Sequence, residues 1–294
     1  MAFSRIWVTG AQGSLGQDLI PFLQAKGYKV EGSTSKTLNL LEPQEAITKK
    51  MAVFAPEIII HTAAMTQVDK AQLEPDLAMA INKDGTQKIA LAANELGAIL
   101  CYVSTDYVFD GQTQTPYTTE SKPNPINTYG LSKYYGELMV QELCDPFYIV
   151  RTSWLYGVNG NNFVQFVLDS ARQGRSVSIV NDQWGSPTWT GSLCHLLEQV
   201  ITSGGFGIYH GCDQGVITRY DQALHICKAA GLSADHIKPV SNKVFEQPAP
   251  RPTFTALNPS PLAVPHWETA FEAFLTQYFE RHNHQAKLIE KPVS

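Results

Sequence analysis

The sequence predicts an α/β protein in which a doubly wound parallel sheet is accompanied by a smaller mixed α/β domain. Three observations point to this class. Short apolar runs alternate with helical patterns through the first half of the chain, which is typical of parallel strands buried on both faces. A glycine-rich turn directly follows the first apolar run. The chain has 294 residues, which suits one large domain with a smaller companion.

The first element is a strand, because Arg5 to Val8 form a short apolar run. Thr9 to Gly16 follow as a turn with the spacing G-x-x-G-x-x-G, and apolar residues then recur at helical spacing up to Lys26. Glycines here permit a tight turn, close approach of backbone N–H groups to a pyrophosphate, and close packing of helix on sheet. The pattern predicts a Rossmann-like dinucleotide site, with an ordinary glycine-rich turn as the alternative.

The second strand, residues 28–33, is predicted to end beside the ribose of a bound dinucleotide. Ser33, Thr34, Ser35 and Lys36 offer hydroxyl groups and a positive charge there, and such groups can hold a 2′-phosphate. The sequence therefore favours NADPH over NADH. The alternative is that Lys36 simply points into water.

The remaining pattern continues the alternation and then becomes more mixed. Small residues such as Ala64 follow the next strand, where they would let a ligand lie close to the backbone. The predicted division is a dinucleotide-binding domain at 1–155 with returning segments at about 181–210, substrate-binding segments at 156–285, and a tail at 286–294. We predict helices at 42–54, 74–96, 129–143, 163–173, 189–202, 218–230 and 267–278, strands at 57–60, 98–103, 147–151, 177–180 and 207–210, and a polar turn at 181–188.

Composition and charge count against several classes of protein. The chain is 44% hydrophobic and 17% charged, as expected for a globular protein with a sizeable core. Its formal charge of -5 comes from 22 basic and 27 acidic residues without a long run of either sign, which argues against nucleic acid or a membrane as the main partner. No apolar run approaches membrane-spanning length, and Met1 to Val8 are too short and polar for a signal peptide, so a cytoplasmic location is predicted.

Cysteine and histidine spacing predicts neither disulfides nor a metal site. The 5 cysteines are widely spaced and include no C-x-x-C pair. They are expected to be buried, reduced thiols. The 8 histidines show no metal-ligand spacing.

The strongest catalytic candidates are Tyr129 and Lys133, which lie four residues apart in a predicted helix. This spacing places both side chains on one face, about one turn apart. A nearby ammonium favours the phenolate, so Lys133 is expected to lower the pKa of Tyr129 and ease proton exchange near neutral pH. Ser104 and Thr105 fall at the carboxyl end of the strand at 98–103, where open α/β sheets bind ligands. The alternatives are a solvated Tyr/Lys pair and an ordinary turn.

Motifs that together resemble a known family occur along the chain to about Leu257: Thr9–Gly16, Ser104–Gly111, Tyr129 with Lys133, Arg151–Gly157, Asn161–Phe163 and Asn181–Thr188. They resemble the extended short-chain dehydrogenase/reductases, and within them the dTDP-4-dehydrorhamnose reductase family. The glycine motif and the Tyr/Lys pair are typical of the whole superfamily. The Arg-Thr-Ser-Trp and Asn-Asp-Gln segments are far more specific.

The resemblance implies reduction of the 4-keto group of dTDP-4-dehydro-L-rhamnose to dTDP-L-rhamnose with NADPH or NADH. Tyr129 would donate the proton, Lys133 would hold the nicotinamide ribose, and Thr105 would bond the sugar. The cofactor would be lined by Gly10, Gln12, Gly13, Gly16, Asn39, Leu40, Ala64, Met65 and Thr66, in addition to Ser33 and Lys36. The substrate candidates are Ser104, Thr105, Asp106, Trp154, Asn162, Phe163, Asp182, Gln183 and Arg251. Core packing is the alternative for Trp154, and a surface position is the alternative for Arg251.

Two other functions stay open at this point. The regulatory subunit of methionine adenosyltransferase is similar in fold, keeps NADP binding and shares the Tyr107–Gly111 stretch, although Trp154 and Asn181–Gln183 fit the reductase better. A reductase of another nucleotide-linked 4-keto sugar is also compatible with the sequence, since loops distinguish sugar epimers. Some family members have a glutamate in a magnesium-assisted dimer contact where Trp189–Ser192 stand here. A metal-linked dimer is therefore not expected, and the chain is predicted to be a monomer or a homodimer.

Overall fold

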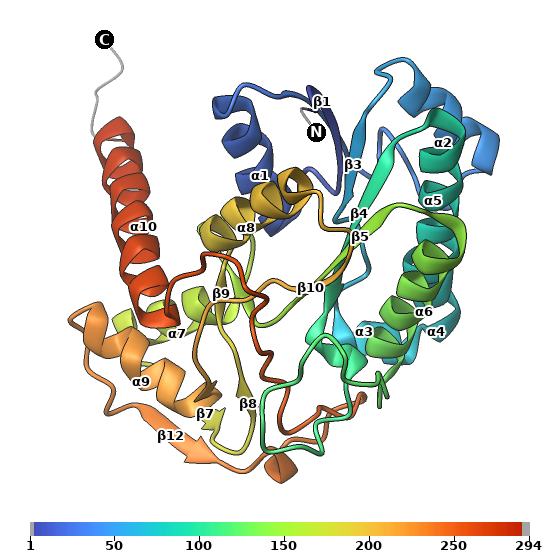
Figure 1. Ribbon diagram of the computed structural model, residues 1–294. Coiled ribbons are helices and arrows are strands. Elements are labelled where there is room, and N and C mark those ends of the chain that lie inside the picture. The colour runs from blue at the N-terminus through green and yellow to red at the C-terminus, as the bar shows by residue number, and fades with distance from the viewer. Residues whose placement is uncertain (1–2, 290–294) are drawn as a thin grey trace.

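A six-stranded parallel sheet forms the centre of the computed structural model, which describes residues 3–289 (Figure 1). The strands lie in the order β2, β1, β3, β4, β5, β10, and each neighbouring pair is parallel. The strand order reverses around β1, and open α/β sheets bind ligands at the carboxyl ends of strands beside such a reversal. The bounds are β1 (Arg5–Thr9), β2 (Lys29–Ser33), β3 (Ile58–His61), β4 (Ile99–Thr105), β5 (Phe147–Thr152) and β10 (Gly207–His210).

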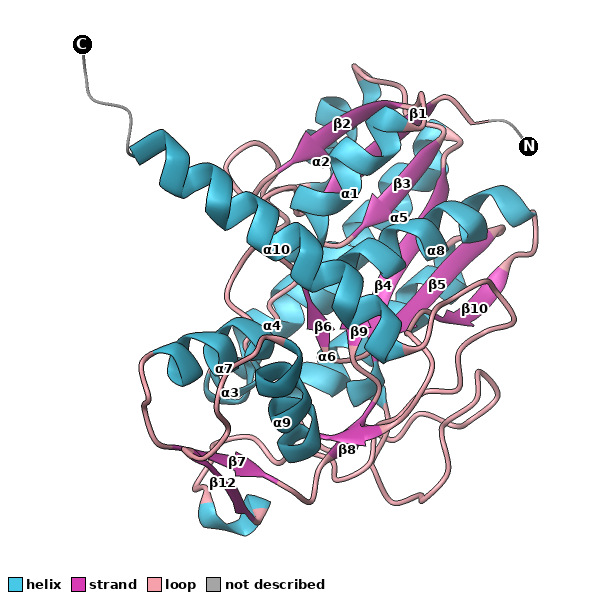
Figure 2. Cartoon of the chain, turned by 90° about the vertical axis from the view of Figure 1, so that its left-hand side faces the viewer, coloured by secondary structure: helices cyan, strands magenta, loops and turns pink. Residues whose placement is uncertain are grey.

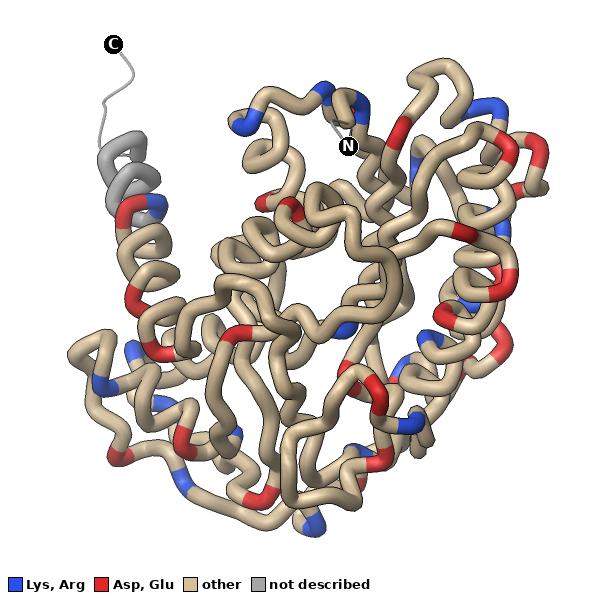
Figure 3. The backbone as a smooth tube through the Cα atoms, in the orientation of Figure 1, with Lys and Arg blue, Asp and Glu red and all other residues tan. Residues whose placement is uncertain are grey.

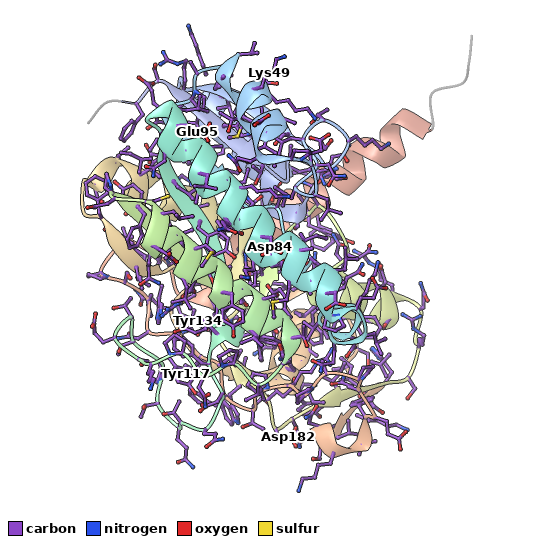
Figure 4. All side chains as sticks on the ribbon, turned by 90° about the vertical axis from the view of Figure 1, so that its right-hand side faces the viewer. Lys49, Asp84, Glu95, Tyr117, Tyr134 and Asp182 are labelled. Atoms are coloured by element: carbon purple, nitrogen blue, oxygen red, sulfur yellow. The ribbon has the colours of Figure 1, made fainter. Side chains whose placement is uncertain are left out.

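Helices cover both faces of the sheet because its strands send alternate apolar side chains to opposite sides (Figure 2). On one face, α1 (Ser14–Ala25) and α8 (Thr190–Ser203) bury Leu19 and Leu197 against Val8. On the other face, α2 (Gln44–Ala52), α5 (Gly85–Leu96) and α6 (Thr128–Leu143) pack around Trp7 and Ile59. Figure 4 shows α5 and α6 lying side by side across this second face. The predicted doubly wound sheet is confirmed.

A second hydrophobic core lies beside the sheet, between α7 (Phe163–Arg172), α9 (Arg219–Ala229) and α10 (Trp267–Ile289). Leu168, Ile226 and Phe274 are fully buried in it. Three short ladders join segments that are far apart in the sequence, so this part is mixed α/β. They pair β7 (Val177–Val180) with β12 (Ile237–Val240), β6 (Leu155–Tyr156) with β9 (Thr188–Trp189), and β8 (Trp184–Gly185) with β11 (Ile217–Thr218).

The predicted helix at 74–96 contains a π-helical turn, Ala80–Asp84, between α4 (Pro75–Met79) and α5. Asn82 in this turn accepts the N–H of Met65 at 2.8 Å and donates to its carbonyl at 3.1 Å. It also donates to the Ser132 hydroxyl at 2.9 Å. Such turns occur often at functional sites. Through these hydrogen bonds, the π-helical turn connects the segment after β3 with α6. The turn was not predicted, because the residues on both sides of it have helical periodicity.

Other boundaries also differ from the predictions. The short helix α3 (Val68–Leu73) was not predicted, and the supposed polar turn at 181–188 contains β8 and the start of β9. The last helix runs past the predicted end at Tyr278 to Ile289. Residues 290–294 of the predicted tail lie outside the described residues. Single-turn helices occur at Asp106–Val108 and Asn242–Val244.

All five cysteines are free and buried, which confirms that prediction. Basic and acidic positions are interspersed over the part of the chain that is coloured in Figure 3. Within residues 3–289, no helix combines the length and the apolar character needed to cross a membrane.

Candidate active site

A cavity of about 630 Å³ opens at the carboxyl ends of β1, β3, β4 and β5. The glycine turn after β1 forms one wall, and segments after β5 and at the start of α9 form another. Because β4 lies between β3 and β5, the residues at its end lie between these walls. The predicted site residues that line this cavity are Gly10, Gln12, Gly13, Ala64, Thr66, Ser104, Thr105, Asp106, Tyr129, Lys133, Trp154, Asn162 and Phe163.

The glycine turn is shaped for close contact with a pyrophosphate. Gly10 has a φ of +72°, a conformation that favours glycine. A Cβ on Gly16 would lie 2.3 Å from the Gly10 carbonyl oxygen, so only glycine lets the helix pack against the turn. Gly13 begins α1 without a side-chain hydrogen bond to the first turn. The N–H groups there are suited to an anion, which fits a dinucleotide.

We expect Gly16→Ala to weaken NADPH binding about tenfold or more, because overpacking typically costs about 1–3 kcal/mol. The added methyl would push the Gly10 carbonyl and distort the turn. Fluorescence titration with NADPH measures this, with Gln24→Ala at an exposed position of the same helix as the control. Equal affinity of both variants and the unsubstituted protein would contradict the assignment of this turn to the cofactor.

Helix α6 carries Tyr129 and Lys133 to the end of β4. The Asn127 side chain caps this helix by accepting the Gly130 N–H at 2.8 Å. Gly130 permits close packing, since a Cβ there would lie 2.0 Å from the Tyr107 carbonyl oxygen. Tyr129 and Lys133 therefore line the cavity from the first two turns of a helix whose N-terminus is held in place by capping and close packing.

The side chains of the pair have different partners. The Tyr129 hydroxyl is hydrogen-bonded to Thr105. Lys133 Nζ donates to the Val103 carbonyl at 2.8 Å and lies 4.0 Å from the centroid of the Tyr102 ring. A phenol and a threonine hydroxyl thus meet in the cavity, while the ammonium is anchored on the sheet.

Burial controls the ionisation of this pair. Desolvation raises the pKa of Tyr129, and the Thr105 hydrogen bond opposes that shift. Lys133 is 2% exposed, and burial lowers its pKa to about 7, while Glu137 acts to raise it. The expectation that Lys133 lowers the pKa of Tyr129 is therefore wrong. The physical reason is that desolvation of the phenolate dominates, and the ammonium is held by the Val103 carbonyl and the Tyr102 ring.

A buried carboxyl group adjoins the Thr105 hydroxyl. Asp106 is 3% exposed and accepts hydrogen bonds from Thr105 at 3.1 Å and from Ser153 at 3.0 Å. Burial raises the pKa of Asp106 to about 6, and hydrogen bonds from Thr255, Ser153 and Thr105 oppose the shift. Asp106 thus changes charge near neutral pH beside the candidate catalytic residues.

Trp154 occupies an unusual backbone conformation, with a φ of +45° that is uncommon for a non-glycine residue. Its ring lies on Gly185, where a Cβ would come within 2.3 Å of it. The Arg219 guanidinium lies 3.5 Å from the Trp154 ring centroid and 4.8 Å from that of Phe163. Trp154 is half-buried and lines the cavity, so it is not simply a core residue. Backbone strain of this kind is found mostly at functional sites.

Asn162 fixes the segment that leads into α7. Its side chain accepts the Gln165 N–H at 3.2 Å, capping the helix, and donates to the Gly157 carbonyl at 2.8 Å. The Ser14 hydroxyl at the start of α1 donates to the Asn159 carbonyl at 2.7 Å. This hydrogen bond joins the glycine turn to the wall of the cavity that carries Asn162.

Several predicted cofactor residues lie outside the lining of the cavity. Ser33 is 2% exposed, and its hydroxyl accepts the Trp7 indole N–H at 3.0 Å. Thr34 and Ser35 line the cavity instead, and Lys36 is exposed away from that lining. The others are Gly16, which supports the turn, Asn39, which accepts the Leu41 N–H, Leu40 in the core, and Met65, clamped by Asn82.

The predicted substrate residues Asp182, Gln183 and Arg251 also lie outside this lining. The Asp182 carboxylate, labelled in Figure 4, accepts from the Ser241 hydroxyl at 2.6 Å. Asp182 borders a second cavity of about 560 Å³. Gln183 donates to Asn242 Oδ1 at 2.9 Å. Arg251 Nη2 donates to Asp69 Oδ2 at 2.8 Å, so its charge is already paired.

Sequence reasoning missed some residues that line the cavity, above all Arg219, with Tyr107, Ser153 and Gln222. Arg219 directly follows Thr218, which caps α9 by accepting the Asp221 N–H. The local pattern there is that of any helix start. No signal in the sequence separated Arg219 from a surface arginine.

The parallel sheet, the glycine turn and the Tyr/Lys pair at the end of β4 define the chain as an extended short-chain dehydrogenase/reductase. The model of the RmlD substrate binding domain family matches residues 4–280. The chain belongs to this family, that of the dTDP-4-dehydrorhamnose reductases.

Named relatives are similar over most of their length. The dTDP-4-dehydrorhamnose reductase of Mycolicibacterium smegmatis is 37% identical over 86% of this chain and 78% of its own length. The dTDP-4-keto-6-deoxy-D-glucose reductase of Streptomyces niveus is 33% identical over 94% of this chain and 96% of its own. The crystal structure of the Bacillus anthracis dTDP-4-dehydrorhamnose reductase in complex with NADP is 36% identical, with a TM-score of 0.90 over 94% of this chain and 100% of that one.

Proposed function

We propose that this protein reduces the 4-keto group of dTDP-4-dehydro-L-rhamnose to give dTDP-L-rhamnose, with NADPH or NADH as the reductant. The observation that carries the proposal is the convergence of Tyr129, Lys133 and Thr105 in a cavity that begins at the glycine turn. Family membership supports it, since the Mycolicibacterium smegmatis relative has this activity in its name. The NADP complex of the Bacillus anthracis relative supports the choice of cofactor.

In the proposed mechanism, Tyr129 is the proton donor. A phenol of ordinary pKa is already protonated at neutral pH, and burial raises the pKa of Tyr129 further, so the side chain carries the proton that it would give to the developing alkoxide. Thr105, already hydrogen-bonded to the phenol, would bond the same oxygen and stabilise its negative charge. A bound nicotinamide supplies the hydride. The anchored Lys133 ammonium would hold the ribose of that cofactor beside Tyr129.

The cofactor residues that we propose are those of the cavity wall after β1 and β3. Gly10, Gln12 and Gly13 would bind the pyrophosphate, and Ala64 and Thr66 would lie along the rest of the dinucleotide. Thr34 and Ser35 are the polar groups of the cavity that follow β2, where a ribose or its 2′-phosphate would lie.

NADPH consumption with a panel of keto sugar nucleotides tests the proposal. We expect rapid consumption with dTDP-4-dehydro-L-rhamnose, slower consumption with other nucleotide-linked 4-keto sugars, and dTDP-L-rhamnose as the product by mass spectrometry and NMR. Faster turnover of another keto sugar would favour the alternative that the Streptomyces niveus relative represents. Absence of turnover with every sugar, together with NADPH binding and copurification of another enzyme, would favour the non-catalytic subunit.

A further inference from the structure

The cavity contains one cation that the proposed mechanism does not use. Among the described residues that line it, Lys133 and Arg219 are the basic ones. The Lys133 ammonium is committed to the Val103 carbonyl. Arg219 forms no ion pair within 4.0 Å of any carboxylate of the described chain, although Asp106 and Tyr107 interact with it electrostatically. Its guanidinium donates to Gln222 Oε1 at 3.2 Å. Most of its N–H donors therefore remain available.

Two aromatic rings lie against the Arg219 guanidinium. The group stacks at 3.5 Å from the Trp154 ring centroid and 4.8 Å from that of Phe163. Stacking occupies the faces of a guanidinium, whereas its hydrogen-bond donors lie in its plane. An anion can therefore approach along the edge without displacing either ring.

One small scaffold holds both Arg219 and Trp154. Strand β11 pairs with β8, and Arg219 follows β11 directly, with its N–H donating to the Gln183 carbonyl at 3.2 Å. Gly185 in β8 supports the Trp154 ring, which a side chain at that position would displace. The guanidinium is thus preorganised, which lowers the entropy cost of binding an anion.

We propose that Arg219, and not the predicted substrate residue Arg251, binds the diphosphate of the nucleotide sugar. The inference rests on the proposed function, because a nucleoside diphosphate sugar brings negative charge into this cavity. Arg219 lines the cavity from the start of α9, whereas the glycine turn after β1 is already assigned to the cofactor's pyrophosphate. Arg251, by contrast, has its charge neutralised by Asp69 and lies outside the lining. The planar fork of an arginine also matches phosphate oxygens bidentately.

Calorimetric titration of the full chain with dTDP, thymidine and NADPH tests this assignment. For Arg219→Gln we expect about 100-fold weaker dTDP binding, because one partner of a desolvated charge pair is removed. Thymidine and NADPH affinities should change by less than about threefold, since neither uses this group. Arg219→Lys keeps a positive charge but lacks the planar fork of donors of a guanidinium. Its dTDP affinity should be about tenfold weaker than that of the unsubstituted protein, and thus higher than that of Arg219→Gln. Circular dichroism and thermal unfolding establish that each variant is folded.

The matched control is Arg175→Gln. Arg175 also stacks on an aromatic ring, that of Phe166 at 5.6 Å, but it is exposed and lies outside the cavity. We expect its dTDP affinity to equal that of the unsubstituted protein. The inference would be overturned if Arg219→Gln bound dTDP with normal affinity. It would also be overturned if the affinity of this variant for thymidine or NADPH fell as much as its affinity for dTDP. A 100-fold loss in Arg251→Gln without one in Arg219→Gln would overturn it as well.

The two proposals fail separately in this design. If the unsubstituted protein bound dTDP through Arg219 but consumed NADPH with no keto sugar, the reaction would be wrong and the diphosphate site would stand. If it turned over the keto sugar while Arg219→Gln left KM unchanged, the reaction would stand and the assignment of Arg219 would be overturned. If it bound no dTDP at all, the assignment would also be overturned.

Discussion

Tyr129→Phe should lower kcat with dTDP-4-dehydro-L-rhamnose by about 100- to 10,000-fold, the range for loss of a general acid. The substitution removes only the hydroxyl that hydrogen-bonds Thr105, and the ring can keep its edge contact with Tyr107. NADPH binding should therefore stay within about threefold, a change below 1 kcal/mol. Stopped-flow or steady-state loss of NADPH absorbance gives kcat, and fluorescence titration gives the affinity.

Tyr135→Phe is the matched control for that substitution. Tyr135 lies on the same helix but is 38% exposed and does not line the cavity. It should keep full activity. Near-normal turnover by Tyr129→Phe would remove Tyr129 from the role of proton donor, and equal losses in both variants would indicate damage to α6.

Glu137→Gln should lower the free energy of unfolding by about 3–5 kcal/mol, the usual cost of breaking a buried ion pair. Glu137 and Arg151 are 0% and 2% exposed, and the guanidinium donates to both carboxylate oxygens, at 2.9 and 2.7 Å. Replacing the carboxylate by an amide leaves the Arg151 charge buried without a counter-ion. Equilibrium unfolding in urea measures the difference.

An exposed ion pair provides the comparison for Glu137. Lys50 Nζ lies 2.7 Å from Glu42 Oε2, but the two side chains are 39% and 33% exposed. Glu42→Gln should therefore cost less than about 1 kcal/mol. A loss for Glu137→Gln as small as that for Glu42→Gln would show that the interior accommodates the unpaired arginine.

Much of the fold could be predicted from the sequence because its signals are local. Buried parallel strands give continuous apolar runs, and the strands at 177–180 and 207–210 were predicted with the observed bounds. The helix of Tyr129 and Lys133 was also confirmed, ending at Leu143. The two-residue strands β6, β8, β9 and β11 were missed, since so short a segment becomes a strand only through its distant partner.

The pKa shifts of Tyr129 and Lys133 could not be predicted from the sequence. Spacing placed Lys133 one turn from Tyr129, and from this the sequence suggested a lowered pKa for the phenol. Burial reverses the direction for Tyr129 and lowers the pKa of Lys133 to about 7. Desolvation depends on every segment that covers a group, so no local pattern reports it.

The sequence alone was enough to predict the parallel sheet, the glycine turn and the pairing of Tyr129 with Lys133, because a local pattern signals each of them: continuous apolar runs, glycine spacing and helical periodicity. The folded chain, by contrast, distinguishes two arginines that look alike in the sequence. Asp69, far from Arg251 along the chain, neutralises it, whereas the rings of Trp154 and Phe163 hold Arg219 in the cavity. Which charge is paired and which is left for a ligand depends on long-range packing, and that emerges only when the chain is folded.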